Sequence, residues 1–380
     1  LQEFGQLNAA VKSYEQAIAI KPDLAEAYSN RLFVFNYASN YDSNFLLNQA
    51  VNYGEIFRNK VTTPFLHFNC SHEPQKPRIG FVSGDLRNHP VGYFLESVLS
   101  ELSQKNLELI AYTTTPKFDE LSAHFKPLFS EWKPLYGLTD ENAAKLIHND
   151  GIHILIDLSG HTALNRLPVF TWKPAPIQIT WLGYFATTGV NEIDYILGDP
   201  YVTPTSLESQ FTETIYQLPK TRWCFTPPKV DIKISSPPAL TNGYVTFGCF
   251  NNLTKMNEQV ISLWIKILAA IPSSCLLLKA KQLNSLSIQS KIIKQFTTAG
   301  INPERITCEG SEPREKYFAA YQRIDIALDP FPFTGGTTTM ESLWMGVPVL
   351  TLQGDSLVAR QGVGILMNAD LSNWIAQDKD

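Results

Sequence analysis

Several features that mark other classes of protein are scarce or absent in this 380-residue sequence. Only 18% of its residues are charged and 44% are hydrophobic, which argues against a disordered chain or a coiled coil. The net charge is −5 and no basic run occurs, so we expect no nucleic acid bound by a cationic surface. No apolar stretch approaches about 18 residues, so we expect no membrane span.

Cysteine is scarce too, and its spacing argues against both disulfides and zinc. The five cysteines show no C-x-x-C spacing and do not cluster with histidine, so we predict free thiols and no metal site. The chain opens LQEF, without a cationic and then apolar leader. Unpaired thiols and the missing export signal together predict a cytoplasmic protein. The cysteines are Cys70, Cys224, Cys249, Cys275 and Cys308.

Residues 1–36 have a pattern of their own. Small and apolar positions recur at helical spacing on both sides of Pro22, which breaks one helix before the next begins. This pattern is typical of a tetratricopeptide repeat, whose period is about 34 residues. We predict a partial repeat here and further repeats before Leu1, because such units need stacked neighbours. The alternative is a helical hairpin that caps the next domain.

The rest of the chain alternates between strands and helices. We predict a helical linker over 37–76, a domain over 77–200, a Pro-, Ser- and Thr-rich linker over 201–242 and a second domain over 243–380. Alternation favours parallel sheets with helices on both faces, so the fold class is α/β with two Rossmann-like, doubly wound domains facing across a cleft. The predicted strands are 79–83, 107–112, 152–158, 177–182, 244–250, 275–279, 305–308, 324–328 and 347–352.

The strongest local signal is PFPFTGGTTTMESLW over 330–344, which follows a predicted strand. Glycines such as Gly336 let a ligand approach the backbone, and the hydroxyls of Thr337 and Thr338 with free amides at a helix start can hold a diphosphate. We expect Glu341 in the first helical turn, aimed at ribose hydroxyls. No G-K-[ST] follows, so this is not a Walker motif. The alternative is a glycine turn with a threonine cap and no ligand.

Other polar groups follow predicted strands. Asp85 and His89 lie four residues apart after the first strand, where they can share a proton or orient an acceptor hydroxyl. Lys255 follows the first strand of the second domain and can neutralise a departing diphosphate. Arg314 and Tyr317 open a helix and are weaker candidates for phosphate and base contacts. The alternatives are a turn-capping Asp85 with His89 as a polar loop residue, and a solvated Lys255.

Two further stretches lie at the same edge of the first domain. The Gly- and Thr-rich loop within 174–189 suits the wall of a sugar or acceptor site, and 159–162 should lie beside it. There His161 is as consistent with a structural role as with a functional one. The only Asp-x-Asp pair, at 378–380, has no strand context, so we predict no divalent ion on the diphosphate. The negative charge of the leaving diphosphate must then be neutralised by cationic side chains and by the amides at a helix start.

These motifs resemble those of the O-linked N-acetylglucosamine transferase family, above all its SPINDLY-like branch, from residue 1 to about 366. The matching segments are the repeat, SGDLRNHP, DGIHILIDLSGHT, PAPIQITWLGYFATTG, FGCFNNLTK and TGGTTTMESLWMGVPVLTL. The resemblance implies a GT-B fold and an inverting, metal-independent transfer from UDP-GlcNAc to protein Ser or Thr, without a cofactor. It also implies protein acceptors selected by the repeats. Some SPINDLY-type relatives use GDP-fucose, so protein O-fucosyl transfer is an alternative, and a catalytically silent repeat-based binding protein is another.

The resemblance also implies roles for single residues. Asp85 and His89 match the acceptor side, where His89 is the residue thought essential, and Lys255 matches the lysine on the diphosphate. Animal enzymes have a histidine where this chain has Gly336. The family continues beyond the position of Asp380, which implies a C-terminal domain that is truncated here. The positions matched to nucleotide contacts are Asn252, Lys255, Arg314, Thr337, Thr338 and Glu341. Gly336 and Tyr317, which the sequence pattern itself selects, complete the predicted nucleotide-binding set.

Overall fold

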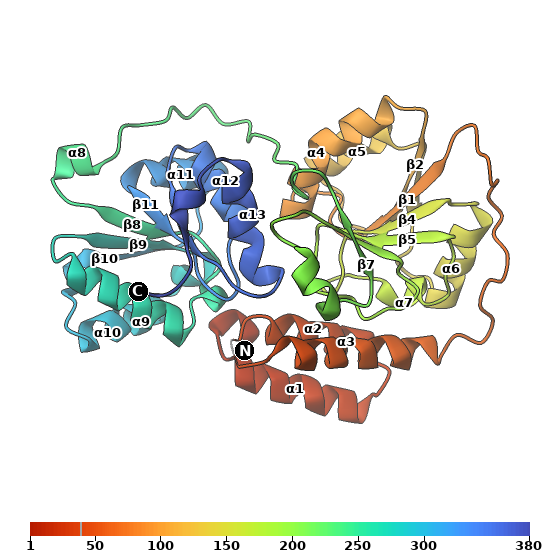
Figure 1. Ribbon diagram of the computed structural model, residues 1–380, viewed down its shortest axis with the longest axis horizontal. Coiled ribbons are helices and arrows are strands. Elements are labelled where there is room, and N and C mark those ends of the chain that lie inside the picture. The colour runs from red at the N-terminus through yellow and green to blue at the C-terminus, as the bar shows by residue number, and fades with distance from the viewer. Residues whose placement is uncertain (39) are drawn as a thin grey trace. The chain divides into compact units, whose positions relative to one another are not determined.

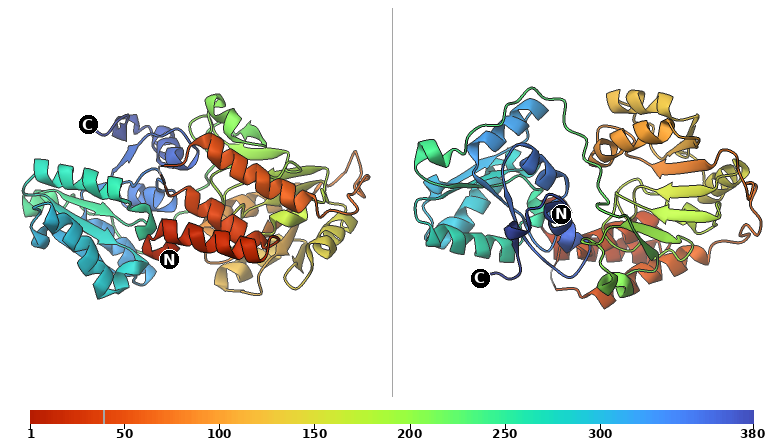
Figure 2. Two further views of the ribbon diagram at one scale, coloured as in Figure 1. Left: turned by 90° about the horizontal axis from the view of Figure 1, so that it is seen from below. Right: turned by 45° about the horizontal axis from the view of Figure 1, so that its top comes forward.

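The computed structural model describes residues 1–38 and 40–380 and divides them into two compact units. The N-terminal unit comprises residues 11–35 and 40–226. The C-terminal unit comprises residues 227–380, together with 1–10 and 36–38 from the start of the chain. Each unit is built around its own parallel sheet (Figures 1 and 2).

Three α-helices precede the first sheet in the described chain: α1 (Leu7–Ile20), α2 (Ala25–Phe35) and α3 (Ser43–Arg58). The predicted break at Pro22 lies between α1 and α2 and is confirmed. Tyr28 of α2 packs against α3, with ring centroids 6.3 Å from Tyr53 and 6.1 Å from Phe57. The segment predicted as a helical linker, 37–76, is therefore helical only over α3, which packs against the helix before it. Residue 39, within that segment, lies outside the described residues.

The sheet of the N-terminal unit has the order β3-β2-β1-β4-β5-β6-β7, and all of its pairs are parallel. This order, with the first strand inside the sheet, is that of a doubly wound Rossmann-like domain. The strands are β1 (Arg78–Ser83), β2 (Glu108–Thr113), β3 (Glu131–Pro134), β4 (Ile154–Asp157), β5 (Ile177–Thr180), β6 (Tyr195–Gly198) and β7 (Thr214–Gln217). The helices of this part are α4 (Pro90–Ser103), α5 (Glu120–Phe125), α6 (Asp140–Asn149) and α7 (Leu167–Phe170).

The sheet of the C-terminal unit repeats this plan, with the parallel order β10-β9-β8-β11-β12-β13. Its strands are β8 (Thr246–Cys249), β9 (Cys275–Lys279), β10 (Ile306–Glu309), β11 (Ile326–Leu328), β12 (Val349–Leu352) and β13 (Ile375–Ala376). Its α-helices are α8 (Ala239–Asn242), α9 (Glu258–Ala270), α10 (Leu286–Thr298), α11 (Arg314–Ala319), α12 (Thr337–Trp344) and α13 (Gln361–Asn368), and its short 3-10 helices include η1 (Gln2–Phe4) and η4 (Leu253–Lys255).

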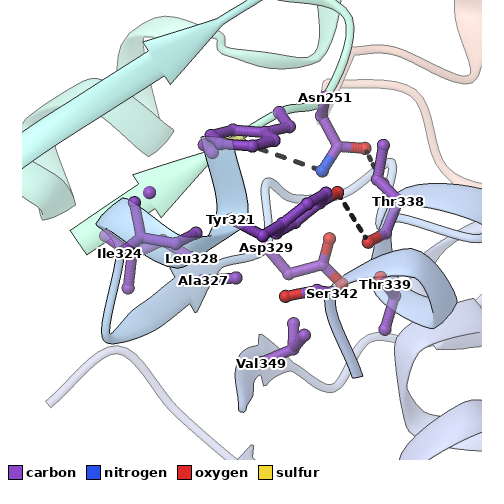
Figure 3. Close-up of a pocket in the computed structure, with 13 residues that line it drawn as sticks. Asn251, Tyr321, Ile324, Ala327, Leu328, Asp329, Thr338, Thr339, Ser342 and Val349 are labelled. Carbon is purple, nitrogen blue, oxygen red and sulfur yellow. Dashed lines mark hydrogen bonds between the residues drawn. The ribbon is translucent and has the colours of Figure 1, made fainter. Parts of the chain in front are cut away.

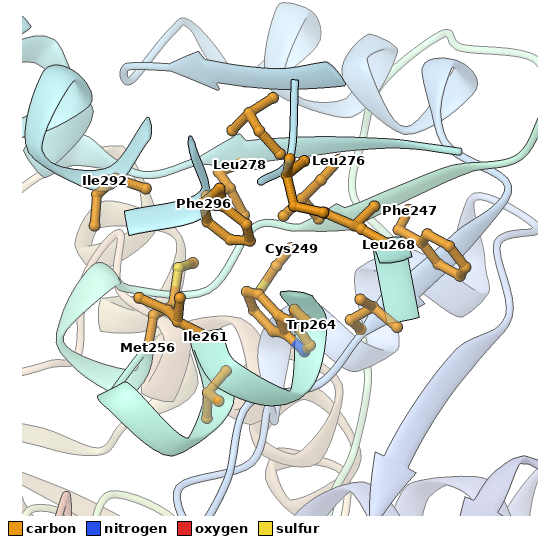
Figure 4. Close-up of a cluster of buried hydrophobic side chains, with 14 of the residues drawn as sticks. Phe247, Cys249, Met256, Ile261, Trp264, Leu268, Leu276, Leu278, Ile292 and Phe296 are labelled. Carbon is orange, nitrogen blue, oxygen red and sulfur yellow. The ribbon is translucent and has the colours of Figure 1, made fainter. Parts of the chain in front are cut away.

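Alternation along β9 shows why both faces of the second sheet are covered. Leu276 and Leu278 pack into a core with Trp264 of α9 and Phe296 of α10, all nearly inaccessible to solvent (Figure 4). Leu277 belongs to a separate core on the other face. Successive side chains of a strand point to opposite faces, so three leucines in a row require helices on both sides.

All nine predicted strands are present, with ends that shift by up to two residues. The sequence pattern missed β3, β6, β7 and β13, which are two to four residues long. One of them corrects a domain boundary: β7 pairs with β6, so the first sheet extends into the predicted linker 201–242. The side chains of β7 are mostly exposed, and it therefore lacks the apolar run of a buried strand. Among the described residues, no helix is both long and apolar enough to cross a bilayer.

Candidate functional site

The predicted glycine turn connects β11 to α12 in the C-terminal unit. Gly336 occupies the N-cap position of α12 and supplies no side-chain cap, so the first amides of the helix point out of the turn without a cap. A β-carbon on Gly335 would collide with the hydroxyl of Thr339 and would lie 2.8 Å from Asp329 Oδ1. Only glycine fits there. The turn is confirmed, and the alternative of a threonine N-cap is wrong because the cap residue is Gly336.

Lys255 lies at the end of η4, after β8, and is held from two sides. Its Nζ donates to Asn251 Oδ1 at 3.1 Å and to the carbonyl oxygen of Thr334, in the glycine turn, at 2.9 Å. Burial lowers the pKa of Lys255 to about 8, against the opposing attraction of Asp329. An ammonium has three hydrogens, so these two hydrogen bonds leave one, and the ring centroid of Phe333 lies 4.0 Å from Nζ. The alternative of a solvated lysine is wrong.

The threonines that open α12 differ in what they can offer a ligand. Thr338 Oγ1 donates to Asn251 Oδ1 at 2.9 Å, so its hydroxyl hydrogen is already committed (Figure 3). Thr339 Oγ1 is buried and has no hydrogen-bond partner among the described residues. It lines a cavity of about 10 Å³, the size of one water molecule. Backbone amides, rather than the Thr338 hydroxyl, are therefore the ready anion donors at this helix start.

Asp329 is the residue of this site that the sequence reasoning did not select. Its buried carboxylate accepts from the Gly335 N–H at 2.6 Å and from Thr351 Oγ1 at 2.8 Å. Burial raises its pKa to about 6, and Lys255 opposes that rise. The available signal was its position, directly after a buried strand and before a glycine turn.

Glu341 lies on the second turn of α12, not on the first as predicted. It is buried, and its Oε2 accepts from the Tyr317 hydroxyl at 2.8 Å, while Oε1 lies 3.8 Å from a guanidinium nitrogen of Arg314. Burial raises the pKa of Glu341, and the Tyr317 hydrogen bond and the charge of Arg314 act against that rise. Tyr317 and Arg314 open α11, as predicted, and the fold brings them to Glu341 from 24 and 27 positions away along the chain.

A pocket of about 260 Å³ opens beside Tyr317 at the carboxyl ends of β9 and β10. Its lining includes Asn252, Gln282 and the pair Lys279 and Glu312. The Lys279 ammonium is buried and donates to Glu312 Oε2 at 2.6 Å, which lowers the pKa of that carboxyl. An ionised carboxylate thus faces this pocket.

The N-terminal unit holds the second predicted group. His89 is the N-cap of α4, with Nδ1 3.3 Å from the Val91 N–H and 3.5 Å from Asp85 Oδ2. A proton on Nε2 satisfies the first contact, and a proton on Nδ1 satisfies the second. Arg87 also donates to Asp85 Oδ1 at 2.9 Å. Burial lowers the pKa of His89, and the neighbouring Asp85 opposes this shift.

His161 has a structural role. It is fully buried, with Nδ1 2.9 Å from Ser29 Oγ of α2 and Nε2 2.8 Å from the carbonyl oxygen of Thr188. Burial lowers its pKa to about 4, so the ring is neutral at pH 7. This histidine connects helix α2 with the loop that follows β5 through its two hydrogen bonds.

The fold therefore gathers the predicted nucleotide contacts in one unit, and Asp85 and His89 in the other. Among residues 1–38 and 40–380, no three His, Cys, Asp or Glu side chains are grouped in a way that could hold a metal ion. The nucleotide contacts gathered in the C-terminal unit are Asn252, Lys255, Arg314, Tyr317, Gly336, Thr337, Thr338 and Glu341.

Two Rossmann-like sheets with polar residues at their carboxyl ends define the GT-B class of fold. The chain belongs to glycosyl transferase family 41, whose profile matches residues 57–226 and 226–380. A tetratricopeptide-repeat profile matches residues 3–33, which confirms the predicted repeat.

Named relatives agree with this assignment. The chain is 34% identical over 376 residues to the probable UDP-N-acetylglucosamine–peptide N-acetylglucosaminyltransferase SPINDLY of Oryza sativa subsp. japonica, covering 97% of this chain and 40% of the relative. It is 33% identical to the SPINDLY protein of Solanum lycopersicum, covering 96% and 40%. The chain thus spans about 40% of the length of these curated relatives.

Solved structures give the same result. A mutant O-GlcNAc transferase of Thermobaculum terrenum superposes with a TM-score of 0.93 at 34% identity, covering all of this chain and 72% of that one. The galactosyltransferase WaaB of the lipopolysaccharide outer core shares the fold alone, with a TM-score of 0.51 at 12% identity, covering 80% of this chain and 92% of that one.

Proposed function

We propose that this chain transfers N-acetylglucosamine from UDP-GlcNAc to Ser or Thr hydroxyls of proteins, with inversion and without a metal ion. The names of the SPINDLY relatives, probable UDP-N-acetylglucosamine–peptide N-acetylglucosaminyltransferases, support the donor and the peptide acceptor, and the O-GlcNAc transferase of Thermobaculum terrenum supports the transferred sugar. The observation that carries the proposal is the hydrogen bond from Lys255 to the Thr334 carbonyl in the glycine turn. It places a cation beside a helix start at one sheet edge.

On the donor side, the leaving diphosphate develops negative charge as the glycosidic bond breaks. The third hydrogen of the Lys255 ammonium and the amides of Thr337 and Thr338 would bind that charge. The Glu341 carboxylate would accept hydrogen bonds from the ribose hydroxyls, and the hydrogen bond from Tyr317 would fix its orientation. Cationic and amide donors thus supply the stabilisation that a divalent ion supplies in metal-dependent transferases.

On the acceptor side, inversion requires the hydroxyl to attack the anomeric carbon opposite the leaving group and to lose its proton. His89 is neutral near pH 7 because burial lowers its pKa. With its Nδ1–H directed at Asp85, the Nε2 lone pair would accept that proton or orient the hydroxyl. The repeat over residues 3–33 would contribute to binding the acceptor protein.

A second candidate donor is GDP-fucose, which the pocket beside Tyr317 favours. Guanine presents N1–H and N2–H₂ donors along one edge, and these can pair with the ionised Glu312 carboxylate. Uracil presents one N–H flanked by two carbonyl oxygens, which a carboxylate repels.

Calorimetric titration of the full chain with UDP and with GDP tests both candidates. Tight UDP binding and transfer of N-acetylglucosamine to a Ser/Thr peptide support the proposal, whereas tight GDP binding without UDP binding replaces it by fucosyl transfer. Binding of neither nucleotide would leave a repeat-based binding protein. Undiminished transfer in both His89→Ala and Lys255→Ala would reject the assigned roles.

A further inference from the structure

Asp329 and Lys255 hold the same peptide group. The carbonyl oxygen of Thr334 accepts from Lys255 Nζ at 2.9 Å, and the next N–H, that of Gly335, donates to Asp329 Oδ1 at 2.6 Å. A single peptide bond carries both that carbonyl and that N–H. A carboxylate and an ammonium therefore polarise the turn from opposite ends, and such chains of hydrogen bonds strengthen one another.

We infer that Asp329 is a positioning residue for the diphosphate, because one carboxylate both orients the glycine turn and supplies the counter-charge of Lys255. This inference rests on the proposed function. We place Asp329 behind the ammonium rather than on the ligand, because each of its oxygens already accepts a hydrogen bond, from Gly335 and Thr351, and its negative charge would repel a diphosphate. It acts through the ammonium and the amides that would bind the diphosphate.

The surroundings of Lys255 leave Asp329 as its counter-charge. The titratable groups that act on the ammonium are Asp329, after β11, and Cys249, at the end of β8. Burial raises the pKa of the Cys249 thiol to about 12, so it is neutral below that pH. The remaining contacts of Lys255 are neutral: Asn251 Oδ1, the Thr334 carbonyl and the ring of Phe333, whose centroid lies 4.0 Å from Nζ.

The chain offers a matched control in the N-terminal unit. Asp157 is likewise buried at the end of a central strand, and burial raises its pKa to about 6 as well. Its oxygens accept from the amides of Ser159 and Gly160, at 3.1 and 2.8 Å, and from Thr180 Oγ1 at 2.8 Å. The charged group that acts on Asp157 is Glu213, and no lysine of the described residues acts on its carboxylate. Asp157 is thus a loop-holding carboxylate without a cation.

The test compares Asp329→Asn with Asp157→Asn. Asparagine keeps an oxygen for the Gly335 N–H and removes the charge, so a change in Asp329→Asn reports the counter-charge rather than the shape. The dissociation constants of UDP and GDP are titrated from pH 6.5 to 9 for the full chain, with melting temperatures recorded for each variant. A third variant, Lys255→Arg, stays charged throughout this range.

We expect wild-type affinity for the nucleotide to fall as the pH rises through about 8, where Lys255 loses its proton. In Asp329→Asn this fall should begin roughly one pH unit lower, because an ammonium without its counter-charge deprotonates more easily. Affinity should then be about fivefold to tenfold weaker at pH 8 and within about twofold at pH 6.5. Asp157→Asn should follow the wild-type curve, and Lys255→Arg should show no alkaline fall.

Superposition of the Asp329→Asn and wild-type curves, or equal shifts in both Asn variants, would overturn the inference while leaving the proposed function intact. Binding of neither nucleotide by the wild-type chain would reject both. If Asp329→Asn merely unfolded the turn, affinity would fall equally at pH 6.5 and 8, which also contradicts a counter-charge.

Discussion

The carboxyl edges of the two sheets share a scaffold and differ in chemistry. β4 pairs with β1 in the first sheet, and β11 pairs with β8 in the second. Each of these strands leads to a buried aspartate that accepts hydrogen bonds from a glycine-containing loop. The loop after the first strand differs: β1 leads to Asp85 and His89, whereas β8 leads to Lys255. The fold thus repeats the supporting aspartate in both units, whereas the residues after the first strand give one edge an imidazole beside a carboxylate and the other edge an ammonium.

Replacement of Lys255 or His89 should cause the greatest losses and should separate the roles of the two sheet edges. Lys255→Met should weaken nucleotide binding about 100-fold or more, because a charge-assisted contact and the clamp on the glycine turn are lost together. His89→Ala should leave nucleotide affinity within about twofold but lower the transfer rate by about 10²–10⁴, the usual range for an acid–base group. Calorimetry and a peptide transfer assay separate the two. Equal loss of affinity in both variants would contradict the division of roles between the units.

A smaller effect concerns the pH dependence of stability. The pKa of buried His161 is lowered to about 4, so the unfolded chain binds a proton near pH 6.5 that the folded state excludes. The contribution of His161 to the free energy of unfolding is present above pH 6.5 and is lost as the pH falls toward 4. The loss between pH 7 and pH 5 is about 2 kcal/mol. The pKa of Asp157 is raised to about 6, so its contribution has the opposite sign.

Denaturant unfolding at pH 7 and pH 5 checks this prediction with His161→Gln. The variant is expected to lose stability at pH 7, since Ser29 and Thr188 lose a partner. The gap between variant and wild type should shrink by about 2 kcal/mol at pH 5. A gap that stays constant with pH would show that His161 does not resist protonation.

A third comparison concerns two tyrosines that each donate to a carboxylate. Tyr317→Phe removes the donor to buried Glu341 and should lower the free energy of unfolding by about 1–3 kcal/mol and the nucleotide affinity several-fold. Tyr112 of the N-terminal unit donates to Asp150 at 2.6 Å in the same way. Tyr112→Phe should cost similar stability and leave the affinity unchanged. Chemical denaturation and UDP or GDP titration distinguish these outcomes, and equal loss of affinity would remove Tyr317 from the nucleotide site.

Much of the fold was predictable because hydrophobic runs report burial. Strands buried on both faces, such as Cys275–Lys279, carry apolar residues at successive positions, and the alternating helices then imply parallel pairing. Short strands with exposed side chains escaped the prediction. Thr214–Gln217 is held by backbone pairing to β6 and has no apolar pattern of its own. The predicted linker over 201–242 therefore wrongly included this strand.

The candidate site was predictable where a residue follows its own strand. Lys255, Gly336 and His89 lie within a few residues of a strand or at a helix start, so their positions follow from local pattern. The predicted position of Glu341 within its helix was wrong by one turn, because the helix already starts at Thr337, four residues before Glu341.

The repeat, the two doubly wound sheets and the loops that carry polar residues follow from local sequence pattern, since periodicity and glycine placement are local properties. The hydrogen-bond partners depend on the folded chain: Lys255 bonds to the Thr334 carbonyl 79 positions away, Tyr317 to Glu341, and Asp329 to Gly335. The reason is physical. A hydrogen bond depends on where neighbouring strands bring two backbones together, and a pKa depends on how much water the surrounding chain removes.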